Sequence, residues 1–272
     1  MKLKDWCDLN RKFFTESDFR YLINTNFSFE SCFETSTVFL SDENVVFLNR
    51  VLDRYRNGEP LAYILGKEEF YGLEFKVNPD VLIPRKETEL IVEYCIDLIQ
   101  SRKFVKVLDL CCGSAVIAIT VKKMTAMALN LTAADISEKA LAVASENSQK
   151  HNQNIRFVAS DLYSALEGEK FDLIISNPPY VKTGQIEGSL KFEPIIALDG
   201  GFDGLFFIRR ILAESLIFLN PSSCLVIEIG YDQRLEVIEL ASKYGYDIIG
   251  WVKDYSQHFR GIVLRLKETK NQ

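Results

Sequence analysis

The fold is decided by residues 105–122, which read VKVLDLCCGSAVIAITVK. An apolar run of strand type, Val105–Leu110, leads into the short turn Cys111–Ala115 and then into a helical pattern that reaches about Lys122. In open sheets of parallel strands, ligands bind beyond the carboxyl end of such a strand, where small residues let the backbone approach them closely. Only Gly113 represents the three glycines of a dinucleotide fingerprint, so the turn taken alone is an ordinary tight turn.

Further apolar runs continue this alternation of strand and helix along the chain. Strands separated by helical patterns are typical of a doubly wound parallel sheet in an α/β fold. The last two runs differ because their link, Lys253–Gly261, is too short for a helical crossover, and we expect them to pair antiparallel. The expected strands are Val105–Leu110, Leu129–Ile136, Ile155–Ala159, Phe171–Ser176, Leu225–Ile229, Tyr246–Val252 and Ile262–Leu266.

The chain before this region has a different pattern. Apolar residues between Ser41 and Tyr55 follow helical spacing, with Ser41 as a cap and a stop at residues 57–60, and Trp6–Phe14 and Asp18–Ile23 are expected to be shorter helices. Phe70–Val77 alternates around a glycine and predicts a hairpin. We therefore expect a small helical domain over residues 1–65, a hairpin linker over 66–84 and the α/β domain over 85–272.

Composition limits the possible functions. The 272 residues are 47% hydrophobic with a formal net charge of −6, and this acidic balance argues against a general nucleic-acid-binding surface. No apolar run is long enough to span a bilayer, and Met1–Trp6 leads into no signal-like core, so we expect a soluble, cytoplasmic protein. The six cysteines form no C-x-x-C pair and there are only two histidines, so we expect reduced thiols and no metal site.

Polar residues end the second and third of the expected parallel strands. Asp135 is placed to accept hydrogen bonds from ribose hydroxyls, although an acid beside the helix start at Ser137 explains it equally well. Asp161 can accept from an exocyclic amino group and Leu162 can cover a base, but alone Asp161 is more simply a loop acid.

The fourth strand ends in Asn177-Pro178-Pro179-Tyr180. Two prolines hold φ rigid and supply no N–H, so the Asn177 amide oxygen and the Pro178 carbonyl can face a ligand as acceptors. Two such acceptors can hold both protons of a planar NH2 group and aim its nitrogen lone pair at an electrophile, while Tyr180 lies against its flat face. The alternative is a turn that ends a strand.

Together these strand ends resemble those of S-adenosylmethionine-dependent methyltransferases of the seven-stranded, Rossmann-like class. From about Arg54 onward the chain also resembles one family, the release-factor glutamine methyltransferases of HemK/PrmC type. The Asn-Pro-Pro-Tyr motif is shared with amino-adenine DNA methyltransferases, whereas the other segments are more specific. The segments that carry the resemblance are Arg56–Tyr63, Leu82–Glu89, Asn177–Tyr180, Phe192–Pro194 and Ala197–Leu205.

The resemblance implies methyl transfer from S-adenosylmethionine to the side-chain amide nitrogen of the glutamine in the Gly-Gly-Gln motif of peptide chain release factors. It also implies that the helical domain helps to dock the release factor, and that the enzyme is a monomer without stable nucleic-acid or membrane binding. The implied catalytic residues are Asn177, Pro178 and Tyr180. The implied cofactor-binding residues are Asp109, Cys111, Cys112, Gly113, Ser114, Ala115, Asp135, Asp161, Leu162 and Asn177, and the implied substrate-binding residues are Asn177, Pro178, Pro179, Tyr180, Arg85 and Glu87. An ordinary charged first helical turn explains Arg85 and Glu87 nearly as well.

The cofactor turn departs from the family pattern, because Cys111 and Ala115 stand where the family usually has glycine and Cys112 replaces a small polar residue. If either Cys111 or Ala115 needs a positive φ, we expect weaker cofactor binding. Two alternative functions follow. The same motif serves adenine amino-group methylation, against which the acidic balance argues. A binding protein that kept the fold and lost catalysis is the other.

Overall fold

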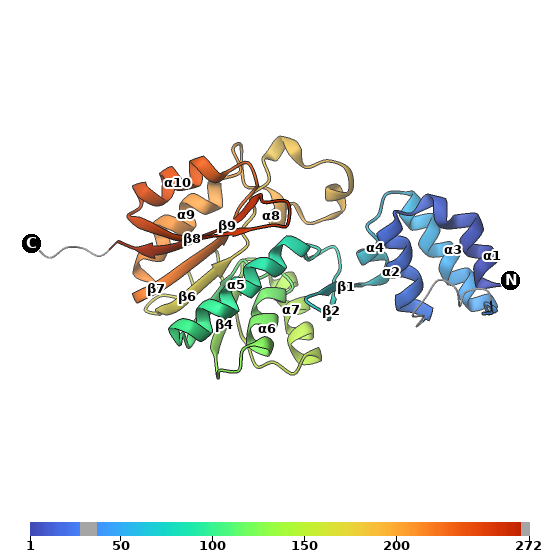
Figure 1. The fold of residues 1–272 in the computed structure, drawn as a ribbon, viewed down its shortest axis with the longest axis horizontal. Helices are drawn as coiled ribbons and strands as arrows, with labels where there is room; N and C mark the ends of the chain where they lie inside the picture. Colours follow the sequence, from blue (N-terminus) through green and yellow to red (C-terminus); the bar gives the residue numbers. More distant parts are fainter. Residues whose placement is uncertain (28–36, 268–272) are drawn as a thin grey trace, which may run out of the picture. The chain divides into compact units, whose positions relative to one another are not determined.

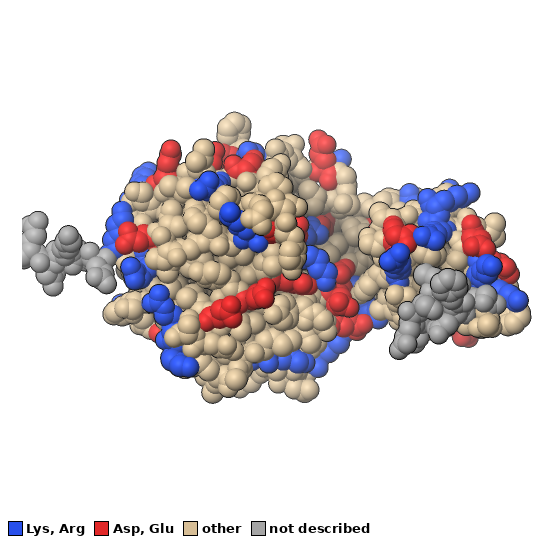
Figure 2. Space-filling model, in the orientation of Figure 1, with Lys and Arg blue, Asp and Glu red and all other residues tan. Residues whose placement is uncertain are grey.

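The computed structural model describes residues 1–27 and 37–267, and Cys32, one of the cysteines expected to be reduced, lies outside them. The chain divides into two compact units, Met1–Gly66 and Lys67–Gln272. Within the described ranges no helix is long and apolar enough to cross a membrane. Figure 2 shows basic and acidic side chains interspersed on the visible face of each unit, without a large field of one sign.

The first unit is helical, as its spacing predicts (Figure 1). The Ser41 hydroxyl accepts from the Asn44 N–H at 3.1 Å and caps the longest helix. Trp6 is fully buried and donates through Nε1 to Asn49 at 3.0 Å, which ties the first helix to this one. The elements are α1 (Leu3–Asn10), η1 (Arg11–Phe13), α2 (Glu16–Phe27), α3 (Asp42–Arg56) and α4 (Leu61–Leu65).

The second unit contains a seven-stranded sheet in the order β5-β4-β3-β6-β7-β9-β8. The first five strands pair in parallel, and β9 pairs antiparallel with both β7 and β8. This confirms the Rossmann-like α/β fold and the antiparallel final pair. The strands are β3 (Lys106–Leu110), β4 (Asn130–Asp135), β5 (Arg156–Ala159), β6 (Phe171–Ser176), β7 (Leu219–Glu228), β8 (Tyr246–Lys253) and β9 (Phe259–Leu266).

Two strands begin earlier than the sequence pattern predicts. β7 starts at Leu219 rather than Leu225, and its polar residues 220–223 concealed the extension. The register of β6 against β7 shifts between Phe171 and Leu173, so that part of the ladder is irregular. β9 starts at Phe259 because the β8–β9 link is a tight turn, in which the Asp254 N–H donates to the His258 carbonyl at 2.9 Å.

Helices cover both faces of this sheet (Figure 1). Successive strand residues point to opposite faces, so Val107 packs with α5, α6 and α7, whereas Leu108 packs with α9 and α10. Both faces are therefore buried, which explains why the parallel strands are almost continuously apolar. The helices are α5 (Lys86–Arg102), α6 (Val116–Met124), α7 (Glu138–Lys150), α8 (Ile195–Leu198), α9 (Phe206–Glu214) and α10 (Arg234–Lys243), with the short turns η3 (Thr183–Gln185), η4 (Gly188–Phe192) and η5 (Ser215–Ile217).

The predicted hairpin forms from β1 (Lys67–Phe70) and β2 (Leu73–Lys76), which pair antiparallel. Its turn residues Tyr71 and Gly72 both have positive φ, as a tight two-residue hairpin turn requires. Asn147 of α7 accepts from the Lys76 N–H at 2.7 Å and donates to the Lys76 carbonyl at 3.0 Å. The hairpin is thus fastened to the second unit.

Candidate active site

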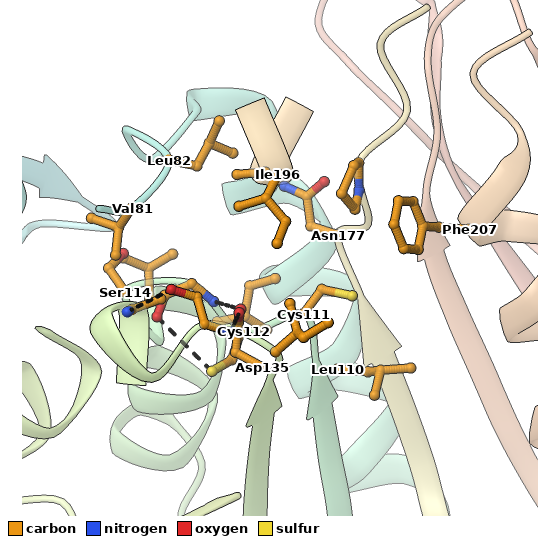
Figure 3. Close-up of a pocket in the computed structure, with 18 of the residues that line it drawn as sticks. Val81, Leu82, Leu110, Cys111, Cys112, Ser114, Asp135, Asn177, Ile196 and Phe207 are labelled. Carbon is orange, nitrogen blue, oxygen red and sulfur yellow. Dashed lines mark hydrogen bonds between the residues drawn. The ribbon is translucent and has the colours of Figure 1, made fainter. Parts of the chain in front are cut away.

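A cavity of about 1020 Å³, counting its open mouth, lies beyond the carboxyl ends of β3, β4, β5 and β6. In Figure 3, Val81 and Leu82 face Asn177 and Phe207 across the cavity, and Cys112, Ser114 and Asp135 form its floor. The wall is mostly apolar with a few carboxylates and amides, which suits a ligand with both apolar and polar parts. The lining residues are Asp80, Val81, Leu82, Pro84, Arg85, Thr88, Leu110, Cys111, Cys112, Gly113, Ser114, Val116, Ile117, Asp135, Ile136, Ser137, Ala140, Ser160, Asp161, Leu162, Asn177, Pro179, Ile196, Ala197 and Phe207.

The turn after β3 has left-handed backbone at two residues that are not glycine. Cys111 has φ of 62° and Ala115 has φ of 61°, beside Gly113 at 53°. A side chain at such an angle meets the following carbonyl oxygen, at a cost of about 1–2 kcal/mol per residue. Both residues therefore have the positive φ for which we expect weaker cofactor binding. The weaker binding itself stays a prediction.

Asp135 holds this turn from the neighbouring strand β4. Its carboxylate accepts from the Gly113 N–H at 2.8 Å and from the Ser137 N–H at 2.9 Å. Burial raises the pKa of Asp135, and the backbone N–H donors oppose that shift. Ser137 caps α7 by accepting from Ala140, so the helix already has its cap and Asp135 is free to face the cavity.

Asp109 lies behind the turn rather than in the cavity wall. It is fully buried, and its Oδ2 accepts from the Ala118 N–H of α6 at 3.0 Å. Its other oxygen has no hydrogen-bond partner within the described residues. Burial raises the pKa of Asp109 to about 7, with the Ala118 bond acting against the shift. The Asp109 carboxyl group therefore stabilises the first turn of α6 through this hydrogen bond.

Asp161 and Leu162 both line the cavity at the end of β5. The Asp161 Oδ1 is paired with Arg210 of α9 at 2.8 Å, a partner that the sequence did not indicate. Leu162 is left-handed with φ of 49°, and its carbonyl accepts from the Ser160 hydroxyl at 2.7 Å. The local bond of Ser160 thus holds Leu162 in a conformation that a leucine rarely adopts.

The Asn-Pro-Pro-Tyr segment contributes Asn177 and Pro179 to the cavity wall. The Asn177 Nδ2 donates to the Thr88 hydroxyl over 3.4 Å, a long hydrogen bond. Tyr180 lies just behind the wall, where its hydroxyl donates to Glu228 at 3.1 Å. Of the predicted site residues within the described ranges, the cavity lining does not include Asp109, Ala115, Pro178, Tyr180 or Glu87.

Two glycines of the segment Ala197–Leu205 pack directly against this turn. A Cβ on Gly204 would lie 2.4 Å from the Tyr180 carbonyl oxygen, and one on Gly200 would lie 2.8 Å from the Pro179 carbonyl oxygen. Gln233, the residue before α10, bridges the two segments, because its Nε2 donates to the carbonyls of Tyr180 at 3.0 Å and Gly204 at 3.1 Å. Only glycine allows this close approach.

Arg85 lines the cavity and is paired with Glu193, which is almost fully buried. Glu193 also accepts from the Ile83 N–H at 3.0 Å, so it joins the segment before α5 to the segment before α8. Glu87 instead lies 3.9 Å from Arg260, outside the lining. Glu89 accepts from the Tyr71 N–H at 2.8 Å and supports the hairpin turn.

Sequence reasoning did not identify one wall of the cavity. Leu82 and Pro84 belong to a segment that resembles the family, and Val81 directly precedes it, but the pattern does not reveal that these residues face the strand ends. Ile196 and Phe207 are similarly unmarked apolar residues. Thr88 lies within the family segment Leu82–Glu89, but nothing in the sequence marks Thr88 or Glu228 as a site residue, since single polar residues near helix starts and strand ends are common. Among the described residues, no group of three or more His, Cys, Asp or Glu is arranged to hold a metal ion.

Known proteins have sequences similar to this one. A family model described as "Methyltransferase small domain" matches residues 87–196. The chain is 38% identical over 224 residues to the release factor glutamine methyltransferase of Clostridium botulinum, a match that covers 79% of each protein. It is 42% identical over 199 residues to the protein of the same name from Burkholderia pseudomallei, covering 70% of each.

Solved structures agree on the fold. A methyltransferase from Pyrococcus furiosus superimposes with a TM-score of 0.53 at 20% identity, covering 78% of this chain and 95% of that one. A ribosomal protein L11 methylase from Lactobacillus delbrueckii subsp. bulgaricus gives a TM-score of 0.53 at 18% identity, covering 71% of this chain and 84% of the other. At such low identity the likeness shows the shared Rossmann-like architecture alone.

Proposed function

We propose that this chain, which belongs to the release factor glutamine methyltransferase family, transfers a methyl group from S-adenosylmethionine to the side-chain amide nitrogen of the glutamine in the Gly-Gly-Gln motif of a release factor. The observation that carries the proposal is that one cavity gathers the strand-end residues Cys111–Ser114, Asp135 and Leu162 together with Asn177. A donor site and an acceptor site for a planar amide thus open into the same space.

The lining fits S-adenosylmethionine on chemical grounds. Each oxygen of Asp135 accepts one backbone N–H, and a carboxylate oxygen can accept two bonds, so capacity remains for ribose hydroxyls. Ile136 and Leu162 offer apolar surface for an adenine ring, and the Asp161 carboxylate can accept from its amino group. When bound, S-adenosylmethionine supplies an electrophilic methyl group attached to a positively charged sulfur.

The substrate half acts by holding the nucleophile. The Asn177 Oδ1 and the carbonyl of Pro178, which adjoins the lining without belonging to it, are the two acceptors for the protons of the glutamine NH2. Accepting both protons withdraws the nitrogen lone pair from amide resonance and aims it at the methyl carbon. The new N–C bond forms as the S–C bond breaks, and the nitrogen then loses one proton. Because the proton leaves after attack, no dedicated general base is required. Tyr180 supports the segment from behind.

We further propose that the unit Met1–Gly66 helps to dock the release factor and that the enzyme works in the cytoplasm as a monomer. The helical unit is compact and has its own buried core. Its removal should raise the KM for the intact release factor more than the KM for a short Gly-Gly-Gln peptide, since the peptide is too small to reach a second surface.

Transfer of label from S-adenosylmethionine to a purified release factor tests the function. The wild-type release factor should be labelled, whereas a variant with Gln→Ala in its Gly-Gly-Gln motif should not. Label on both would place the methyl group at another residue. Label on neither, together with label on DNA adenine, would instead favour the amino-adenine function.

One observation favours the second candidate, a binding protein without catalysis. Cys111 and Ala115 are both left-handed, so the turn is strained where it meets the cofactor. Calorimetric titration with S-adenosylmethionine separates the two candidates. Binding at micromolar concentration supports the enzyme, and no binding at millimolar concentration supports the non-catalytic protein.

A further inference from the structure

Glu228 is a buried carboxyl group beside the Asn-Pro-Pro-Tyr segment. Ser176 and Ile227 are partners in the parallel pair β6–β7, so Asn177 and Glu228 follow at the same level of the sheet. Glu228 exposes 1% of its surface. A carboxylate at that depth is destabilising unless its oxygens accept hydrogen bonds, and the bonds it accepts here lead directly to the site.

Two hydroxyl groups donate to this carboxyl. Thr88 donates to Oε2 at 2.7 Å and Tyr180 donates to Oε1 at 3.1 Å. A hydroxyl has one proton, so Thr88, having donated to Glu228, can only accept from its other neighbour. That neighbour is the Asn177 side chain, whose Nδ2 donates to Thr88.

The direction of these bonds determines which way the Asn177 amide turns. With its NH2 committed to Thr88, Asn177 keeps its Oδ1 as a free acceptor, which is the group that glutamine methylation needs. A reversed amide would present an NH2 to the substrate NH2, and two donors repel each other. The same carboxyl holds the Tyr180 ring through its hydroxyl.

We propose that Glu228 is a positioning residue for methyl transfer, acting through Thr88 to direct the Asn177 carbonyl oxygen at the substrate amide and through its own bond to hold Tyr180. This inference rests on the function proposed above. Glu228 does not line the cavity, so it acts through these two neighbours rather than by touching the substrate.

The burial of Glu228 makes this arrangement sensitive to pH. Burial raises the pKa of Glu228 to about 7; the bonds from Thr88 and Tyr180 and the charge of Arg260 lower it, whereas Glu87 raises it. A protonated Glu228 becomes a donor itself and can no longer accept from both hydroxyls. We therefore expect kcat to fall as the pH drops below about 7. This acidic step in the pH profile of kcat should be absent from Glu228→Gln.

Glu228→Gln tests the bond direction with little change in volume. The glutamine amide accepts with its oxygen and donates with its nitrogen, so one of the two hydroxyl bonds must reverse. We expect kcat to fall by about 10- to 100-fold, the scale of a misplaced catalytic group, with the affinity for S-adenosylmethionine unchanged. Burial of Glu228 makes a folding defect a possible outcome of this variant, so a second series is needed.

Thr88 provides that series. Thr88→Val keeps the shape and removes the hydroxyl, whereas Thr88→Ser keeps the hydroxyl; we expect only the valine variant to lose kcat. Thr120→Val is the matched control, because Thr120 is also a buried helical threonine but its hydroxyl has no partner among the described residues. It should keep normal kcat.

The outcomes separate the inference from the proposed function. Loss of kcat in Thr88→Val, with Thr88→Ser and Thr120→Val near wild type, supports the role of Glu228. Near-normal kcat in folded Thr88→Val, or a wild-type acidic pH step retained in Glu228→Gln, overturns it while leaving the methyltransferase function standing. A wild-type protein that binds S-adenosylmethionine and methylates no release factor overturns both.

Discussion

The segments proposed to hold the cofactor and the substrate, called the cofactor half and the substrate half below, differ in how their backbone is supported. In the cofactor half, left-handed backbone falls on Cys111, Ala115 and Leu162, which all carry side chains. In the substrate half, glycine stands where the chain approaches itself most closely, at Gly200 and Gly204. The first arrangement is strained and held by hydrogen bonds from elsewhere, whereas the second is relaxed and closely packed.

This difference indicates where each half is vulnerable. Strained residues persist only when their surroundings determine them, and Asp135 and Ser160 supply those surroundings through bonds to Gly113 and Leu162. The substrate half instead depends on exact fit and on a buried network of hydroxyl and carboxyl groups. Substitutions that relieve backbone strain should stabilise the cofactor half. Substitutions that add side-chain atoms should destabilise the substrate half.

The largest effect is expected from Asn177→Ala in the substrate half. Removal of the acceptor that holds the substrate amide should lower kcat by at least about 100-fold, the scale seen when one stabilising group of an active site is removed. The midpoint of thermal unfolding should stay close to wild type, because the side chain is only partly buried. Near-normal methyl transfer would contradict the mechanism.

Gly204→Ala should break the packing of the substrate half. The added Cβ meets the Tyr180 carbonyl oxygen and the Gln233 side chain, at a residue whose φ is +74°. We expect a loss of about 2–3 kcal/mol in the free energy of unfolding, measured with urea, together with lower kcat. Gly184→Ala is the control, because no described residue other than its own chain neighbours has an atom within 4 Å of the added Cβ. Equal effects of the two substitutions would refute the packing argument.

Cys111→Gly and Ala115→Gly should stabilise the protein, in contrast to Gly204→Ala. Each removes a Cβ from left-handed backbone, and each should stabilise the fold by up to about 1 kcal/mol and tighten S-adenosylmethionine binding. Ala118→Gly, three residues after Ala115 and within the ordinary helical backbone of α6, should destabilise instead. Urea unfolding and calorimetric titration measure both quantities, and destabilisation by all three glycines would show that the turn is not strained.

Asp109→Asn should have the smallest effect on methyl transfer, because Asp109 lies outside the cavity lining. Its effect should appear instead in the pH dependence of stability. The folded-state pKa of Asp109 is raised to about 7, above the value of about 3.9 in an unfolded chain. Between these pH values the folded protein binds a proton that the unfolded chain does not, so the free energy of unfolding of the wild type decreases as the pH rises towards 7. The stability of Asp109→Asn relative to wild type should therefore increase between about pH 4 and pH 7 and level off above that range. A constant difference would contradict the raised pKa.

Much of the fold could be predicted because its signals are local. The apolar runs and the helical patterns between them predict the order of elements, and the short link between the last two strands predicts their antiparallel pairing. The ends of β7 and β9 were predicted less well, since polar residues in β7 and a tight turn before β9 interrupt the apolar pattern. Leu219 pairs with Phe171 and the regular ladder resumes only at Cys224, so the polar residues between them fall in an irregular stretch that an apolar pattern does not mark as strand.

The strand-end residues could likewise be placed from the sequence. Parallel strands deliver their carboxyl ends to one edge of the sheet, so Cys111, Asp135, Leu162 and Asn177 had to meet. The wall that faces them could not be predicted, because Val81 and Leu82 precede a helix and nothing local says which way that segment turns. The structure shows that Glu193 fastens it, across 110 positions of the chain.

The sequence by itself determined the order of strands and helices, the residues at the strand ends and the family, because these depend on local composition and on short motifs. Only the tertiary structure decided that Cys111 and Ala115 lie in left-handed backbone, since a turn takes its angles from the elements it joins. It alone also brought Thr88 to Glu228, 140 positions away. Hydrogen-bond direction in a buried network depends on which groups meet in space, and that information is absent from any local stretch of the chain.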